Sequence, residues 1–205
     1  HYIPETSRKN EGFLTSGQVN YVCRAGNFRK SGLQYTGALR VLKVMMGYEY
    51  LWVNVRVKGG AYGCMCSFGR SNGARRSGDS YFVSYRDPNL GKTIDVYEKA
   101  ADAIAEFTAD ERTMTQYIIG AVSDLDVPMN PAAKGLYSLS AYMTGLDDAA
   151  LQREREELLS ATVEDIRALS AHIRAFMQED LLCVVGTASK VKEEQERFLK
   201  VENLF

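Results

Sequence analysis

The chain has 205 residues, 45% of them hydrophobic, and its 25 Lys and Arg nearly balance its 26 Asp and Glu, which leaves a formal net charge of -1. The length suits one hydrophobic core, so we expect a single domain over residues 1–205, with residues 1–17 as an N-terminal arm or linker. Balanced charge excludes a whole-chain field that favours nucleic acid or an anionic membrane. Apolar stretches end well before the ~20 residues that span a bilayer, so we expect neither a membrane nor a nucleic-acid partner.

Alternating apolar residues predict three strands in the first half of the chain. Val19, Tyr21 and Cys23 share one face at a spacing of two, as in a half-buried strand. Two further alternating segments, Tyr62–Phe68 and Ser80–Arg86, flank a polar, glycine-containing turn. This order predicts an antiparallel hairpin.

Helical spacing follows the hairpin, because Ile94, Tyr97, Ala101, Ile104 and Phe107 recur on one stripe. Other helix boundaries are predicted from capping residues. These are Thr36 before an interior helix to Tyr48, Thr108–Glu111 as a capping box, Asn130-Pro131 and Gly145 at the two ends of one helix, Thr162 before an acidic first turn, and Ser189 before a last helix.

Two later segments complete the predicted pattern. Asp147–Leu159 is rich in charge and is expected as a surface helix, whereas the continuous apolar run Leu181–Val185 is typical of a central strand. The predicted order is strand, helix, two strands, several helices, strand and helix. It indicates an α+β fold in which a largely antiparallel sheet carries helices packed on one face.

Few residues suit self-contained metal or nucleophilic chemistry. The two histidines, His1 and His172, lie outside any His-x-x-Glu-His motif or its reverse, so we expect no metal site in this chain. His172 borders the apolar stripe of its helix and is expected to be structural. Cys64 and Cys66 could form half of a thiolate site, but a C-x-C pair alone favours core cysteines. All four cysteines are expected to be free thiols in a reducing compartment: Cys23, Cys64, Cys66 and Cys183.

Two alternative binding sites have weak sequence support. The glycines of Lys58–Gly63 lack the G-x-x-x-x-G-K-[ST] pattern of a phosphate loop. Arg70, Arg75 and Arg76, with Tyr81 and Tyr85, could contact single-stranded nucleic acid. We favour a solvated hairpin turn instead, because the chain carries no basic excess.

Arg56 and Tyr62 flank the paired glycines Gly59 and Gly60. A guanidinium, a phenolic hydroxyl and an open backbone edge could therefore point into one cleft, which is an arrangement suited to peptides. The same residue types also fit an arginine in a surface ion pair and a tyrosine in a sheet face. Residue types alone favour this second, structural interpretation.

Three blocks together resemble the C-terminal domain of presequence proteases in the insulinase and pitrilysin family. They are Tyr50-Leu51-Trp52, Val55–Gly63 and Ser84–Asn89. The spacing of the blocks also fits the family. Asn10–Phe13 and the helix start at Thr162 are similar too, so the resemblance spans nearly the whole chain.

The resemblance implies a zinc metalloendopeptidase for short or unfolded peptides, whose two halves enclose a chamber. Zinc would be bound outside this chain, in the N-terminal half, and this domain would close the far side of the chamber. In that family an arginine and a tyrosine reach across to the zinc site, and they match Arg56 and Tyr62. Gly59, Gly60 and Ala61 would contact the peptide backbone. Without a zinc-binding motif the chain alone is expected to be inactive.

The expected location is the bacterial cytoplasm, with an organelle matrix as the alternative. A non-catalytic relative that serves as a scaffold, or as the partner subunit of an active peptidase, is the alternative function. Trp52–Lys58 gives conflicting signals, because its valines alternate as in a strand whereas the resemblance implies a helix end leading into a turn. We adopt the helix.

Overall fold

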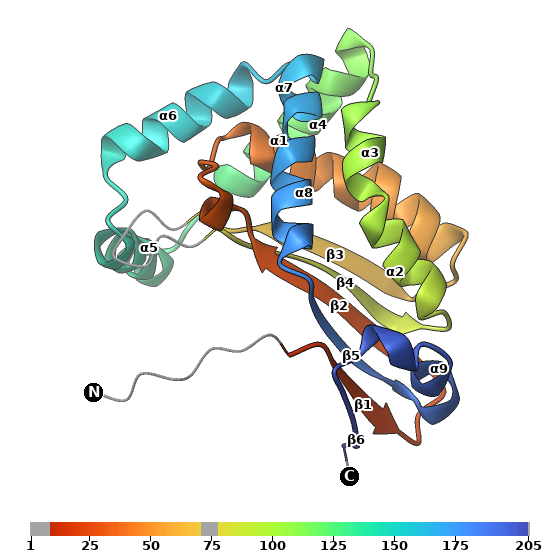
Figure 1. The fold of residues 1–205 in the computed structure, drawn as a ribbon. Helices are drawn as coiled ribbons and strands as arrows, with labels where there is room; N and C mark the ends of the chain where they lie inside the picture. The colour runs from red at the N-terminus through yellow and green to blue at the C-terminus, as the bar shows by residue number, and fades with distance from the viewer. Residues whose placement is uncertain (1–8, 71–77, 205) are drawn as a thin grey trace.

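The computed structural model describes residues 9–70 and 78–204, which form a six-stranded sheet with helices packed on one of its faces (Figure 1). The strand order is β3-β4-β2-β5-β1-β6. The strands are β1 (Glu11–Thr15), β2 (Asn20–Asn27), β3 (Gly63–Phe68), β4 (Asp79–Asp87), β5 (Leu181–Thr187) and β6 (Lys200–Asn203). This arrangement confirms the predicted α+β class.

The described helices are α1 (Ala38–Met45), α2 (Gly91–Glu98), α3 (Ala100–Ala105), α4 (Glu111–Leu125), α5 (Pro131–Thr144), α6 (Asp148–Leu159), α7 (Val163–Ala168), α8 (Ser170–Gln178) and α9 (Ala188–Glu193). Among them, α1 lies between β2 and β3 in the chain, α2 to α8 lie between β4 and β5, and α9 lies between β5 and β6. Shorter turns are η1 (Phe28–Ser31) and η4 (Gln195–Arg197), which are 3-10 helices, and η2 (Met46–Tyr50) and η3 (Trp52–Val57), which are π-helical. None of the helices in the described part of the chain is long and apolar enough to cross a membrane.

Sheet pairing is antiparallel from β3 through β4 and β2 to β5, and parallel from β5 through β1 to β6. The N-terminal segment therefore differs from the arm expected over residues 1–17. Residues 1–8 lie outside the described residues, but β1 pairs on both sides within the sheet. The last element also differs, because a strand follows the short helix α9.

The strand predicted around Tyr21 is present, but its buried face is the opposite one. Val22 is fully buried, whereas Tyr21 is 37% exposed on the open side of the sheet. The prediction was wrong because polar residues occupy the buried face. Asn20 donates to the Asp87 backbone oxygen at 2.9 Å, and Arg24 pairs with Asp180. Polar side chains are tolerated in the interior when they have hydrogen-bonding or ionic partners. On a buried strand face they interrupt the apolar alternation by which the sequence would reveal that face.

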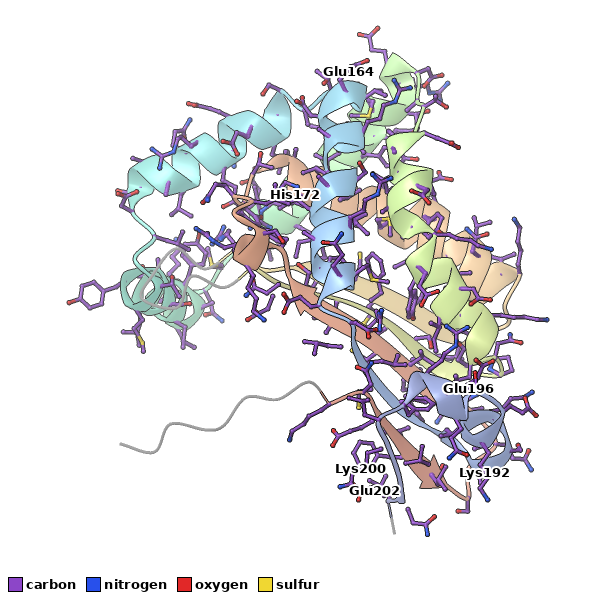
Figure 2. All side chains as sticks on the ribbon, viewed as in Figure 1. Glu164, His172, Lys192, Glu196, Lys200 and Glu202 are labelled. Carbon is purple, nitrogen blue, oxygen red and sulfur yellow. The ribbon has the colours of Figure 1, made fainter. Side chains whose placement is uncertain are left out.

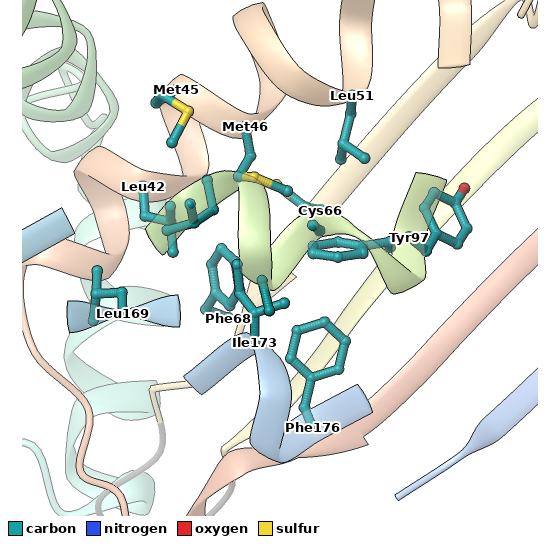
Figure 3. Packing of buried hydrophobic residues seen from close by; sticks show 14 of the residues in the cluster. Leu42, Met45, Met46, Leu51, Cys66, Phe68, Tyr97, Leu169, Ile173 and Phe176 are labelled. Atoms are coloured by element: carbon teal, nitrogen blue, oxygen red, sulfur yellow. The ribbon is translucent and has the colours of Figure 1, made fainter. Parts of the chain in front are cut away.

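The core lies between the sheet and α1, α2, α3 and α8, and Figure 3 shows part of it. Its centre is aromatic. The Phe82 ring is 5.0 Å from the Phe176 ring and 5.5 Å from the Tyr97 ring, between centroids. The predicted stripe from Ile94 to Ile104 is buried as expected, although it is divided between α2 and α3.

Several helix ends confirm their predicted caps, and three do not. Thr36 was predicted to cap α1, but Gly37 is the cap residue there, without a side-chain cap hydrogen bond. Asn130 caps α5, Gly145 ends it with a φ of 68°, and Thr162 caps α7. The start of α4 was assigned to Thr108, but Asp110 is its cap and accepts from the Thr113 backbone nitrogen at 2.8 Å. The start of α9 was assigned to Ser189, but Thr187 caps it. At α4 and at α9 the chain offers two capping residue types with one residue between them, and propensity does not choose between them.

Glu154 anchors the predicted surface helix α6 to the rest of the molecule. Its side chain is 6% exposed and accepts hydrogen bonds from Arg40, from Arg70 at 2.7 Å and from the Tyr35 hydroxyl at 3.1 Å. One carboxylate therefore neutralises two arginines that are themselves largely covered. The charge-rich sequence of this helix predicted exposure and gave no sign of this buried contact.

We expect Glu154→Gln to destabilise the chain by roughly 3 kcal/mol, because removing one member of a buried ion pair leaves uncompensated charge. Chemical unfolding of the purified chain measures the loss. Asp126→Asn is the matched control, since Asp126 pairs with Arg155 at 2.7 Å on the surface. Exposed pairs contribute little, so the control variant should unfold almost like the original. Equal losses in the two variants would contradict the role assigned to Glu154.

His172 is a structural residue of α8, as predicted (Figure 2). Its Nε2 lies 2.8 Å from the Gln34 backbone oxygen, and its ring packs edge-on against Phe28 with centroids 4.9 Å apart. Burial lowers the pKa of the imidazole from its ordinary value of 6.5, and the hydrogen bond to Gln34 opposes that shift. The folded chain therefore favours neutral His172.

This shift predicts a pH dependence of stability. The unfolded chain takes up the His172 proton near its ordinary pKa of 6.5, before the folded chain does. The stability contribution is thus complete above pH 6.5 and is lost as the pH falls toward the lower folded-state pKa. We expect His172→Gln, which keeps an N–H donor for Gln34, to reduce the loss in unfolding free energy between pH 7 and pH 5. An unchanged profile would contradict the assignment.

Candidate functional site

The segment before the paired glycines is helical, which confirms the expectation taken from the family resemblance over the strand pattern. The turns η2 and η3 continue from the end of α1. Leu51 and Val55 are buried and lie one helical turn apart, whereas Val57 is 66% exposed. The alternation of valines misled because only one of them faces the core.

Arg56 is held at the surface by an aromatic side chain from the preceding turn. Its guanidinium carbon lies 3.9 Å from the centroid of the Trp52 ring, so the two groups stack. An arginine over an indole face is an attractive cation-π contact, and the residues are four apart on one helical face. Arg56 is thereby oriented before any ligand arrives.

Gly59 and Gly60 are glycines for different reasons. A Cβ on Gly59 would come within 2.4 Å of the Val55 backbone oxygen, so this residue lets the chain turn tightly against its own helix. Gly60 has a φ of 81°, a left-handed conformation that strains other residues. The Gly60 nitrogen donates to the Arg56 oxygen at 2.8 Å, and the Ala61 nitrogen donates to the Val55 oxygen at 3.2 Å.

These internal bonds limit how the predicted substrate-binding residues can act. Ala61 is buried, and the N–H groups of Gly60 and Ala61 are already satisfied within the chain. The Gly59 oxygen accepts from the Asn89 side chain. Gly60, which is exposed, presents a side-chain-free surface. The role of Gly59, Gly60 and Ala61 in peptide binding stays a prediction.

Tyr62 combines a fixed backbone with an exposed side chain. Its nitrogen donates to the backbone oxygens of Tyr85 at 3.1 Å and Arg86 at 3.3 Å, and its side chain is 66% exposed. The ring contacts Tyr85 edge-on, with centroids 5.8 Å apart, and the Arg86 guanidinium carbon lies 5.9 Å from the ring centroid. Tyr62 is therefore an exposed tyrosine directly before β3, which begins at Gly63.

Asp87 joins the two sequence blocks that flank this site. It is fully buried, and its carboxylate accepts from the Thr93 hydroxyl at 2.6 Å and from the Asn89 backbone nitrogen at 2.8 Å. Burial raises the pKa of this carboxyl, while the hydrogen bonds from Thr93 and Asn89 oppose the rise. Asn89 in turn binds the Gly59 oxygen. The block from Ser84 to Asn89 thus supports the glycine turn directly.

A groove of about 520 Å³ runs beside β3, which is an edge strand, and it adjoins Trp52. Its walls include Tyr48, Met65 and Tyr81, and the charged residues Lys43 and Asp124 also line it. The groove therefore places apolar and aromatic surface next to Trp52, the residue on which Arg56 stacks.

Cys66 of β3 is buried in the core, as predicted, whereas Cys64 is only partly buried against it. Burial raises the pKa of Cys64 to about 11 and that of Cys66 to about 12, so both stay protonated thiols. All four cysteines are free. Among residues 9–70 and 78–204 no group of three or more His, Cys, Asp or Glu could hold a metal ion. The described residues thus provide no binding site for zinc, which the family resemblance places outside this chain.

Residues 10–190 match the family model described as the PreP C-terminal domain. The chain belongs to this family. Protein HypA of Clostridium perfringens (strain 13 / Type A) is 42% identical over 203 residues, which cover 99% of this chain and 20% of that protein. Presequence protease 1, chloroplastic/mitochondrial, of Arabidopsis thaliana is 34% identical over 197 residues, covering 95% and 18%. The presequence-protease domain described here spans about a fifth of the length of these relatives.

Solved structures share the fold at low identity. A peptidase M16 inactive domain from Pseudomonas fluorescens aligns with a TM-score of 0.63 and 15% identity, over 92% of this chain and 46% of that chain. A putative zinc protease from Bordetella pertussis Tohama I gives 0.61 and 12%, over 84% of this chain and 95% of that one. These likenesses support the fold class alone.

Sequence reasoning named Arg56 and Tyr62 but missed the residues that orient them. Trp52 supports the Arg56 guanidinium, and the cation over the Tyr62 ring is Arg86. Both lie within the blocks that carry the family resemblance, which was the available signal. Arg70, the first arginine of the nucleic-acid alternative, pairs with the buried Glu154 at 2.7 Å. Arg75 and Arg76, and His1, lie outside the described residues.

We expect Gly59→Ala to destabilise the domain by about 2 kcal/mol, because its new methyl group would overlap backbone atoms that cannot move aside. Gly47→Ala is the control, since a Cβ there meets nothing within 4 Å, and alanine is the better helix former by up to about 1 kcal/mol. Thermal unfolding of both variants separates the two cases. Similar melting temperatures for the two variants would show that Gly59 does not need to be glycine.

Proposed function

We propose that this domain supplies a peptide-binding and oxyanion-stabilising surface to a zinc metalloendopeptidase that degrades short or unfolded peptides. The observation that carries the proposal is that Tyr62 is exposed while its backbone is held in place. Its hydroxyl-bearing ring is 66% exposed, while its backbone is anchored by two strand-end carbonyls. Membership of the presequence-protease family, and relatives with that name, support the reaction class.

The chemistry follows from the groups that this chain presents. Attack on a peptide carbonyl produces an oxyanion, and a fixed O–H donor close to that oxygen lowers the barrier by about 3 kcal/mol. Tyr62 would donate this hydrogen bond. Arg56, oriented by Trp52, would bind a carbonyl of the substrate and add positive potential. The zinc implied for the family would be held outside this chain.

Further parts of the parent protein would complete the site. The chain spans about a fifth of its relatives, and it presents apolar surface that a larger protein would cover. Helix α5 has no buried residue and exposes Leu136, Leu139, Tyr142 and Met143. Such a cluster is typical of an interaction surface. We infer that the N-terminal catalytic half is the partner, that the two enclose a substrate chamber, and that this domain alone is inactive.

The location follows the relatives. One is bacterial, and another is named chloroplastic/mitochondrial. We therefore propose the bacterial cytoplasm, with an organelle matrix as the alternative. Four free thiols agree with a reducing compartment.

We expect Tyr62→Phe, made in the complete protease, to lower kcat for peptide cleavage by on the order of 100-fold with little change in KM, because a transition-state hydrogen bond is lost. Steady-state kinetics with an unfolded peptide provides the measurement. Tyr117→Phe is the control, since it removes a tyrosine hydroxyl that donates to Glu49 at 2.9 Å and has no part in the candidate site. Unchanged turnover in Tyr62→Phe would remove the catalytic role and favour a scaffold or partner-subunit function.

A further inference from the structure

Arg86 has an unusual backbone conformation next to Tyr62. Its φ is 49°, in the left-handed region that residues other than glycine, asparagine and aspartate seldom adopt. The residue comes directly before Asp87, the last residue of β4, and its carbonyl lies 3.3 Å from the Tyr62 nitrogen. The neighbouring Asp87 is fully buried and hydrogen-bonded, so the strained conformation is held in place from one side.

The Arg86 side chain lies over the aromatic rings of the site. Its guanidinium carbon is 5.9 Å from the Tyr62 centroid and 5.5 Å from the Tyr85 centroid. Tyr85 also packs edge-on against Tyr62 and against Tyr21, with the Tyr21 centroid 5.4 Å away. One planar cation therefore bridges two rings that already contact each other.

We propose that Arg86 is the positioning residue for Tyr62, and this inference deepens the oxyanion role proposed for Tyr62 and rests on it. An exposed ring has few contacts to restrict its rotamer, and here the Tyr85 ring and the Arg86 guanidinium lie against it. Arg86 holds the ring with its side chain and the Tyr62 backbone with its carbonyl. Both contacts act on where the hydroxyl points.

The residue type supports this assignment. Glycine would adopt the left-handed backbone without strain, so the local fold alone does not require an arginine. A planar guanidinium stacks on aromatic faces in a way that a compact ammonium group does not. The presence of arginine at a position that disfavours it indicates that the side chain is used.

Arg86→Gly is the informative variant, because it removes the guanidinium and suits the left-handed backbone. In the complete protease we expect an unchanged or higher melting temperature, and a kcat lowered about 3- to 10-fold with KM nearly constant, because the hydroxyl is misplaced. Arg86→Lys should recover only part of the loss. Arg112→Gln, which removes an exposed arginine at the start of α4, should leave turnover unchanged.

A second variant connects Arg86 to Tyr62. In the Tyr62→Phe background, Arg86→Gly should cause almost no further loss, because the hydroxyl that it positions is absent. Equal losses in the two backgrounds would overturn the proposal, since Arg86 would then act without Tyr62.

A direct readout separates this inference from the catalytic role of Tyr62. With 3-fluorotyrosine at position 62 of the complete protease, Arg86→Gly should shift and sharpen the ¹⁹F resonance, because the ring loses its cation and turns faster. An unchanged resonance would overturn the positioning role. A shifted resonance, combined with normal turnover in Tyr62→Phe, would keep the positioning role and refute the oxyanion role.

Discussion

The buried carboxylate of Asp87 is the interaction on which the candidate site depends. It accepts hydrogen bonds from Thr93 and from Asn89, and the Asn89 side chain binds the Gly59 oxygen. Burying an ionisable group is costly unless its hydrogen-bonding capacity is used. The hydrogen bonds of Asp87 therefore fix the start of α2, the end of β4 and the glycine turn relative to one another. Tyr62 follows the glycine turn, so this arrangement also sets its position.

Arg56 and Tyr62 are both oriented by contacts with aromatic side chains at the surface. A side chain that must reach a ligand cannot be fixed by burial, so it needs contacts at the surface that leave its polar end free. Arg56 stacks on Trp52, and Tyr62 lies against Tyr85 and Arg86. Each contact is weak alone, but an aromatic ring restricts a neighbour over a large area. Both polar ends remain available outside the domain.

Local sequence patterns predicted elements well where one physical requirement dominated. The strands β3 and β4, the caps Asn130 and Thr162 and the stripe from Ile94 to Ile104 follow from periodicity and capping. The pattern failed where partners distant in sequence decided the outcome. Asn20 is buried because Asp87 accepts its hydrogen bond, and Glu154 is buried because Arg40 and Arg70 neutralise it. Strand β1 was missed because pairing on both sides, rather than alternation, stabilises it.

The candidate site shows the same division between local and distant information. Resemblance to a family identified Arg56 and Tyr62. The contact between Arg86 and Tyr62, however, joins a residue of β4 to the residue that precedes β3, and it has no periodic signature in the sequence. The need for glycine at position 59 is likewise visible only in the structure, because the missing side chain makes room for the Val55 carbonyl. When the residues of a motif hold one another in place, a substitution at one of them disturbs the others. That mutual support gives a physical reason why the glycine block and the Ser84–Asn89 block carry the family resemblance together.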